Sequence, residues 1–127
     1  MKKKPIENFL ITRYKKFVSQ FRLVVIDEVQ VRVKEKLVFE SIFEELVNQE
    51  ILSEEIAHID AYGYCEIRRI NNQYASITLS SVNIPDRILN KFDPSRVESL
   101  LGKIGGSLFY HFESNQMSLI LTFQNKK

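Results

Sequence analysis

Two stretches of the sequence alternate between apolar and polar side chains with a period of two residues. In the first, residues 74–82, small or aliphatic side chains alternate with hydroxyl-bearing ones: Ala75, Ile77 and Leu79 against Ser76, Thr78 and Ser80. In the second, residues 117–123, every other side chain is apolar: Met117, Leu119, Leu121 and Phe123. A period of two puts alternate side chains on opposite faces of a strand, so both stretches predict a sheet with one buried face.

Three other segments carry apolar residues at the spacing of a helix with one buried side. We predict helices over residues 5–20, 34–52 and 93–104. Their apolar stripes are Ile6, Phe9, Leu10, Tyr14, Phe17 and Val18 in the first; Val38, Phe39, Ile42, Phe43, Leu46 and Val47 in the second; and Val97, Leu100, Leu101 and Ile104 in the third. Pro5 suits a first helical turn, Asp93 and Pro94 predict the start of the third helix, and Gly105 with Gly106 predicts its end.

The remaining strands complete an alternating order of elements. Residues 21–27, 62–70 and 107–112 are rich in β-branched or aromatic side chains, and residues 71–73 supply a turn between two strands. Residues 83–92 are predicted to be irregular. The order α-β-α-β-β-α-β-β predicts an α+β fold, a two-layer α/β sandwich with a mixed sheet of about five strands and the helices on one face.

The length of 127 residues fits one compact unit, in which an amphipathic N-terminal helix (residues 1–20) precedes the rest (residues 21–127). The single cysteine, Cys65, excludes an intramolecular disulfide, and its place in a strand indicates a small buried side chain. His58 and His111 show no metal-ligand spacing, so no metal site is expected. No apolar stretch could span a membrane, and we expect a cytoplasmic protein.

Positive charge is concentrated at the N-terminus. Residues 1–22 hold seven basic residues and one acidic residue, a net charge of +6, whereas the remainder holds 11 basic and 15 acidic residues, a net charge of −4. Such an arm can contact nucleic acid, anionic lipid or an acidic protein surface, and it can equally be a solvated helix face with a lysine-rich end.

Three segments in this order resemble the ATP-binding domain of the GHKL superfamily, which unites gyrase, heat-shock chaperones, histidine kinases and mismatch-repair proteins. Residues 21–29 resemble the opening strand, residues 43–52 resemble the helix that carries the so-called N box, and residues 96–108 resemble the last helix with its paired glycines. The resemblance is to the histidine-kinase branch, and it covers residues 21–124. It implies the fold predicted above and a site for magnesium and ATP.

Only part of the ATP site implied by this resemblance is present. Asn48 matches the residue that ligates magnesium in the family, and Glu44 matches the acidic residue one turn earlier. Gln49 replaces the usual alanine, and Ile51 and Leu52 replace a basic residue and a histidine or aromatic residue. Glu44 and Asn48 are therefore vestigial candidates, which could also be plain members of a solvated helix face.

The adenine-binding and lid motifs of the family have no counterpart here. The family reads adenine with an aspartate in a glycine-rich turn, whereas the matching strand here ends at Ser81, Val82 and Asn83. The family's flexible lid is replaced by residues 84–92, which contain no glycine to build a phosphate-binding nest. We therefore expect a degenerate domain with no catalytic residue and no bound cofactor.

The resemblance implies a regulatory role. We expect a non-catalytic, histidine-kinase-like module, a pseudokinase of two-component signal transduction, which contacts a receiver-like or kinase-like protein or forms a homodimer. The first helix contains no histidine that could accept a phosphoryl group. Its candidate partner surface comprises Phe9, Arg13, Lys16 and Phe17.

Two alternatives stay open. In the first, the chain is a minimal ATPase or kinase that uses Glu44 as a base and Asn48 to hold the magnesium of ATP. In the second, it binds nucleic acid through its basic N-terminal arm, and its affinity falls steeply as salt rises. We regard nucleic acid as the less favoured partner.

Overall fold

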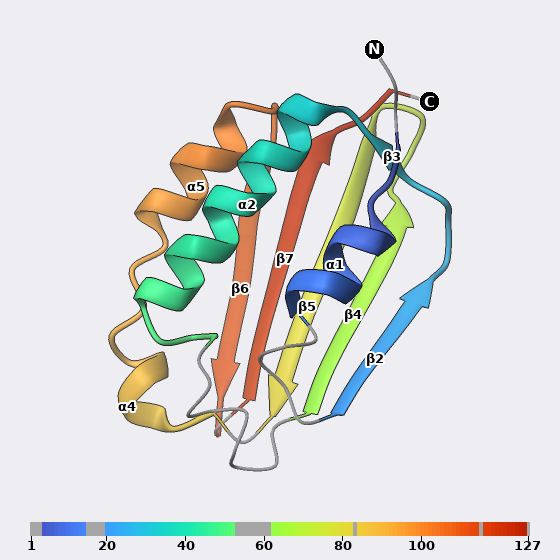
Figure 1. Cartoon of the computed structure of the whole chain (residues 1–127). Helices are drawn as coiled ribbons and strands as arrows, with labels where there is room; N and C mark the ends of the chain where they lie inside the picture. Colours follow the sequence, from blue (N-terminus) through green and yellow to red (C-terminus); the bar gives the residue numbers. More distant parts are fainter. Residues whose placement is uncertain (1–3, 15–19, 53–61, 83, 115, 127) are drawn as a thin grey trace.

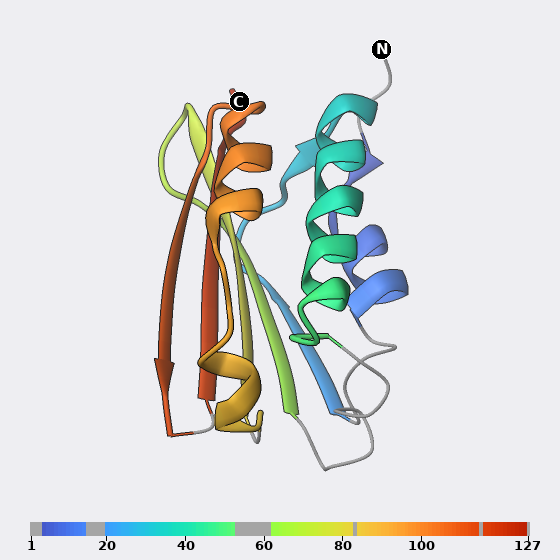
Figure 2. The same cartoon turned by 90° about the vertical axis from the view of Figure 1, so that its left-hand side faces the viewer.

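The chain folds as two layers, a five-stranded sheet and the helices that cover one of its faces (Figures 1 and 2). The computed structural model describes residues 4–14, 20–52, 62–82, 84–114 and 116–126. The helices are α1 (Glu7–Tyr14), α2 (Val33–Asn48), α4 (Asp86–Leu89) and α5 (Ser95–Gly102). The strands are β1 (Lys4–Pro5), β2 (Gln20–Val25), β3 (Gln30–Val31), β4 (Tyr62–Arg69), β5 (Tyr74–Val82), β6 (Ser107–Glu113) and β7 (Gln116–Gln124).

The main sheet has the strand order β2-β4-β5-β7-β6. β2 pairs with β4 in parallel, and the other three pairs are antiparallel, so the predicted mixed sheet of five strands is confirmed. The register aligns the apolar face across strands, because Leu79 lies opposite Cys65 on β4 and Leu119 on β7. The alternation that predicted a one-faced sheet is thus matched between neighbouring strands.

Helices α2 and α5 bury most of their predicted stripes against that face. Figure 2 shows the sheet from its β6 side, with α1, α2 and α5 on one side of it. Phe39 on α2 and Phe123 on β7 are fully buried, and their rings meet edge to face with centroids 5.0 Å apart. This aromatic contact joins the two layers. Phe9 and Leu10 of α1, and Ile6 just before it, belong to the same core.

Helix α2 ends earlier than the predicted residue 52. It stops at Asn48, and Glu50 then adopts a positive φ of 66°, which reverses the chain. This turn brings Ile51 and Leu52 into the core, where each is 1% exposed. The prediction was also wrong for Val47, which is 38% exposed and lies outside the buried stripe.

The end of α5 confirms the glycine stop. Gly105 has a φ of 68°, and the Gly106 N–H donates to the Leu101 carbonyl at 2.8 Å while the Gly105 N–H donates to the Gly102 carbonyl at 3.2 Å. These two bonds form a Schellman motif, which needs a residue in the left-handed region.

Two features were not predicted. β1 and β3 form a short antiparallel pair, with Lys4 opposite Val31. The connection predicted to be irregular contains the single helical turn α4, which is too short to show a helical period in the sequence. The predicted end of the first helix (residues 15–19) and residues 53–61, including His58, lie outside the described residues.

Candidate functional site at the end of helix α2

The two residues predicted as remnants of a magnesium site lie on the solvent-exposed side of α2. Both Glu44 and Asn48 are exposed. Asn48 lines a small hollow of about 180 Å³ between the end of α2 and the segment around α4, and Glu44 does not line it. The other lining residues are Gln49, Glu50, Arg87, Ile88 and Lys91.

Gln49 closes this hollow on one side. Its Nε2 donates to the Asp93 carbonyl oxygen at 2.8 Å, and its Oε1 accepts the Asp93 N–H at 2.7 Å. The same Nε2 donates to Glu45 Oε2 at 2.7 Å. One side-chain amide therefore pairs with both backbone groups of Asp93, 44 residues further along the chain, and holds the end of the β5–α5 connection against α2.

The N-cap of α5 is Pro94, one residue after the predicted cap Asp93, whose side chain nevertheless bonds to the start of the helix. Its Oδ1 accepts the Ser95 N–H at 3.0 Å and the Ser95 hydroxyl at 2.7 Å. These bonds, the backbone one first, lower the pKa of Asp93, because they favour the charged carboxylate. Asp93 thus links α2 through its backbone and α5 through its side chain.

Apolar side chains anchor the β5–α5 connection to the core. Ile84, Ile88 and Leu89 are 1%, 4% and 5% exposed. Phe92 packs edge to face on Tyr110 and Phe112 of β6, with ring centroids 5.5 Å and 5.3 Å apart. The connection is therefore a packed part of the domain rather than a loop held only by its ends.

Charged groups flank the hollow. Arg87 and Glu50 form an ion pair at 3.8 Å, with both side chains more than half exposed, so it contributes little to stability. Lys91 and Asn48 add a cation and an amide to the lining. These groups could contact a small anion, but a hollow of about 180 Å³ is smaller than the roughly 300–1,000 Å³ typical of small-molecule sites.

Ser81, which the sequence resemblance places nearest to the family's adenine-binding aspartate, is 2% exposed within β5. It lies opposite Met117 in the sheet register and does not line the hollow. The structure thus brings Asn48 to a shared hollow with Gln49 but leaves Glu44 and Ser81 apart from it.

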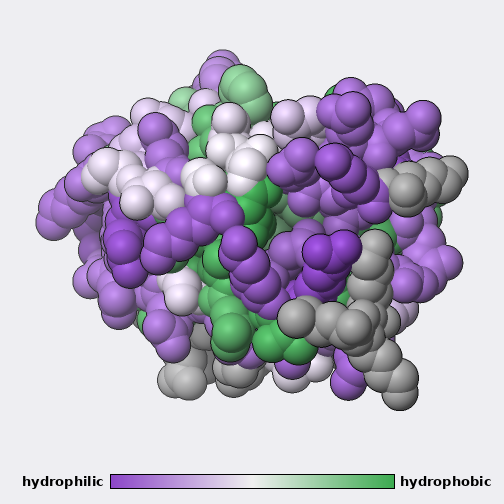
Figure 3. Space-filling view, turned by 90° about the horizontal axis from the view of Figure 1, so that it is seen from above, coloured by the Kyte–Doolittle hydropathy of each residue, from purple (hydrophilic) through white to green (hydrophobic). Residues whose placement is uncertain are grey.

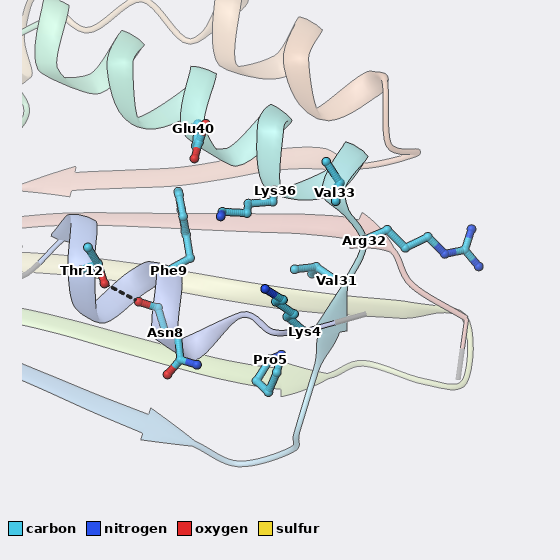
Figure 4. A pocket seen from close by; sticks show the side chains of 10 residues that line it. All are labelled: Lys4, Pro5, Asn8, Phe9, Thr12, Val31, Arg32, Val33, Lys36 and Glu40. Carbon is cyan, nitrogen blue, oxygen red and sulfur yellow. Dashed lines mark hydrogen bonds between the residues drawn. The ribbon is translucent and has the colours of Figure 1, made fainter. Parts of the chain in front are cut away.

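A larger groove, of about 630 Å³, lies between α1 and α2. We call it the α1–α2 groove, and it is lined by Lys4, Pro5, Asn8, Phe9, Thr12, Val31, Arg32, Val33, Lys36 and Glu40. Lys4 and Lys36 extend over it from opposite walls, whereas Arg32 extends away from it (Figure 4). Apolar surface is visible between hydrophilic side chains at the end of the molecule where α2 begins (Figure 3).

The predicted partner surface on the first helix is described only in part. Phe9 is 8% exposed and packs edge to face on Phe43 at 5.4 Å, so it belongs to the core and reaches the surface only at the α1–α2 groove. The prediction that Phe9 lies on an open helix face beside exposed cations is therefore wrong. The Arg13 side chain, Lys16 and Phe17 lie outside what the structure describes, and their role stays a prediction.

Sequence reasoning missed the pairing of Gln49 with Asp93. The sequence showed Gln49 as a departure from the family and Asp93 as a helix cap, but nothing in it joined the two. Among the described residues, no three His, Cys, Asp or Glu side chains gather as metal ligands. No helix within the described ranges is long and apolar enough to cross a bilayer.

Comparison with solved structures finds histidine kinase domains that share this fold. The mycobacterial sensor histidine kinase MprB matches with a TM-score of 0.61 at 11% sequence identity, over 98% of this chain and 99% of that chain. The histidine kinase domain of the E. coli osmosensor EnvZ matches with a TM-score of 0.59 at 8% identity, over 100% of this chain and 90% of that one. No protein-family model and no curated protein matches the sequence.

The histidine kinase ThkA, solved in complex with the response regulator protein TrrA, matches with a TM-score of 0.58 at 13% identity. The match covers 95% of this chain but 38% of the ThkA chain. At identities this low, the likeness shows the fold alone: this chain has the fold of a histidine kinase catalytic domain. The matches to MprB and EnvZ cover nearly the whole chain.

Proposed function

We propose that this chain is a non-catalytic, histidine-kinase-like domain that acts through protein contacts as a regulatory module in cytoplasmic signalling. The observation that carries the proposal is the pairing of the Gln49 amide with both backbone groups of Asp93. A histidine kinase catalytic domain must admit ATP beside the helix that corresponds to α2. Here the connection in the position of the family's lid is tied down to that helix.

Three further features support an unused nucleotide site. The hollow beside Asn48 measures about 180 Å³, which is too small for a nucleotide by the usual size of ligand pockets. Ile84, Ile88 and Leu89 of the connection are buried apolar side chains, and Ile88 lines the hollow. The connection offers no glycine for close backbone approach to phosphates.

The fold also supports the choice of a protein partner. ThkA, which shares this fold, was solved in complex with a response regulator. By analogy, we propose that the partner of this chain is a receiver-like or kinase-like domain or a second copy of the chain. Under this proposal the domain needs no cofactor and has no catalytic residue.

The proposal is tested by titrating ATP and ADP, each with magnesium, into the full chain by calorimetry and by thermal melting. We expect no heat of binding and no melting shift at millimolar nucleotide. A ligand present at a hundredfold excess over its Kd would stabilise the domain by about 2.7 kcal/mol, which melting detects readily.

Asn48→Ala provides the decisive variant and Asn90→Ala, at another exposed asparagine, its matched control. A magnesium-dependent stabilisation that disappears in Asn48→Ala and persists in Asn90→Ala would overturn the proposal. The chain would then be a minimal kinase or ATPase that uses Asn48 for magnesium and Glu44 as a base.

A further inference from the structure

The solvent-exposed side of α2 carries a second stripe, distinct from the one in the core. Its apolar members are Val33, Leu37 and Val47, which are 55%, 56% and 38% exposed. Glu40 and Glu44 lie between them, so that successive members are spaced by four, three, four and three residues. This is the spacing of one continuous helix face that packs against another helix.

Most charges on α2 run against its own dipole. One acid, Glu35, lies in the first turn and accepts the Arg32 N–H at 3.1 Å. Arg32, Lys34 and Lys36 outnumber it at the N-terminus, Glu44 and Glu45 lie near the C-terminus, and the last turn has no basic residue. A helix prefers acidic groups at its N-terminus and basic groups at its C-terminus. The stability of the isolated domain therefore does not explain this distribution.

A second copy of α2 in antiparallel orientation would satisfy both features. We propose that this face of α2 is a homodimer interface, in which two α2 helices pack antiparallel about a two-fold axis. Val33 of one copy then lies against Val47 of the second copy, and Leu37 covers the aliphatic part of Glu44 of the second copy. Such an interface is isologous, so each contact occurs twice.

The charges select the antiparallel arrangement. The basic half of each helix faces the acidic half of the other, and Lys36 of one copy pairs with Glu44 of the second copy. A parallel pair would place like charges side by side. Glu40 lies near the two-fold axis, and it already has an interaction partner of its own.

The position of α2 leaves this face accessible. α2 runs across the front of the helix layer in Figure 1 with no described helix or strand drawn over it, and it lies farther from the sheet than α5 in Figure 2. Glu44, which in a catalytic relative would serve the nucleotide, thereby gains a role in association. The inference deepens the proposed function, on which it rests for the idea that the domain acts through protein contacts.

Sedimentation velocity of the full chain over a wide concentration range tests the interface. We expect a reversible monomer–dimer equilibrium, and Leu37→Glu should abolish the dimer. Lys36→Glu and Glu44→Lys should each weaken association by roughly tenfold or more, because each places like charges together at both symmetric positions. The double variant Lys36→Glu/Glu44→Lys should restore association.

The charge variants also control for folding. Lys36→Glu puts an acid near the start of α2 and Glu44→Lys puts a base near its end, so both suit the helix dipole and should preserve the melting temperature. Glu98→Lys, on the exposed side of α5, serves as the matched charge reversal and should leave the dimer unchanged.

A wild-type chain that stays monomeric at every concentration overturns the inference, as does a double variant that fails to recover. Neither result bears on the nucleotide titration. Conversely, magnesium-dependent nucleotide binding would overturn the proposed function without changing the sedimentation result, so the two failures are distinguishable.

Discussion

The Gln49–Asp93 pairing can be removed by Gln49→Ala without opening a core cavity. The change deletes two hydrogen bonds to the Asp93 backbone, of 2.8 Å and 2.7 Å, and a third at the end of α2, from Gln49 to Glu45 at 2.7 Å, which does not hold the connection. A hydrogen bond contributes about 0.5–1.5 kcal/mol net, and the two to Asp93 lie at an exposed site, so we expect a loss of about 1–2 kcal/mol. That corresponds to a roughly 5- to 30-fold rise in the equilibrium constant for opening of the β5–α5 connection.

Two measurements check this expectation. Urea unfolding gives the free energy of unfolding, and hydrogen exchange followed by NMR reports the protection of the Asp93 N–H, which loses its acceptor. Gln30→Ala is the matched control, because the Gln30 side chain donates to Glu28, two residues away, at 3.0 Å, and so joins no distant segment among the described residues. Its effect should stay within about 0.5 kcal/mol.

Gln49→Glu refines the test through pH. The introduced carboxylate can accept the Asp93 N–H but cannot donate to the Asp93 carbonyl, and it faces the carboxylate of Glu45. The folded state therefore favours the protonated form and raises the pKa of the introduced group. Relative to wild type, the stability of the variant should be greatest below the unfolded pKa of about 4.3 and should fall as pH rises through the raised folded pKa of the introduced group. If Gln49→Ala changes neither stability nor Asp93 exchange, the amide does not hold the connection and the reasoning is refuted.

Two further outcomes follow from packing. Gly106→Ala should destabilise the domain by about 3 kcal/mol or more, because its new Cβ would overlap the Thr122 carbonyl oxygen. Gly102→Ala, whose new Cβ would have no atom within 4 Å, should be neutral or stabilising by up to about 1 kcal/mol. Urea unfolding measures both free energies, and equal effects of the two variants would contradict the geometry. Cys65 is fully buried, and burial raises the pKa of its thiol to about 12, so a thiol-specific reagent at neutral pH should react with it only in denaturant. Rapid reaction of the native chain would show that β4 opens far more often than its place in the sheet indicates.

Local sequence patterns determined most of the secondary structure. The alternation in 74–82 and 117–123 predicted β5 and β7, because the two faces of a strand meet different surroundings. Asp93 and the paired glycines marked the ends of α5 through bonds to groups close in sequence. The resemblance to histidine-kinase domains, which rests on residues 21–29, 43–52 and 96–108, matched the fold that the structure shows.

The sequence could not determine contacts between segments far apart in the chain. Gln49 contacts Asp93 only because α2 and the start of α5 lie side by side. In the sequence, Gln49 cannot be told apart from a glutamine that has no such contact. Val47 followed the periodicity of the core stripe, yet the left-handed turn at Glu50 lets Ile51 and Leu52 fill the core instead. Phe9 fitted an exposed surface as well as a buried one until Phe43 was placed against it. Tertiary structure decided these cases, because each depends on which elements pack together. The residues next to Gln49, Val47 or Phe9 in the sequence do not show which distant element will pack against them.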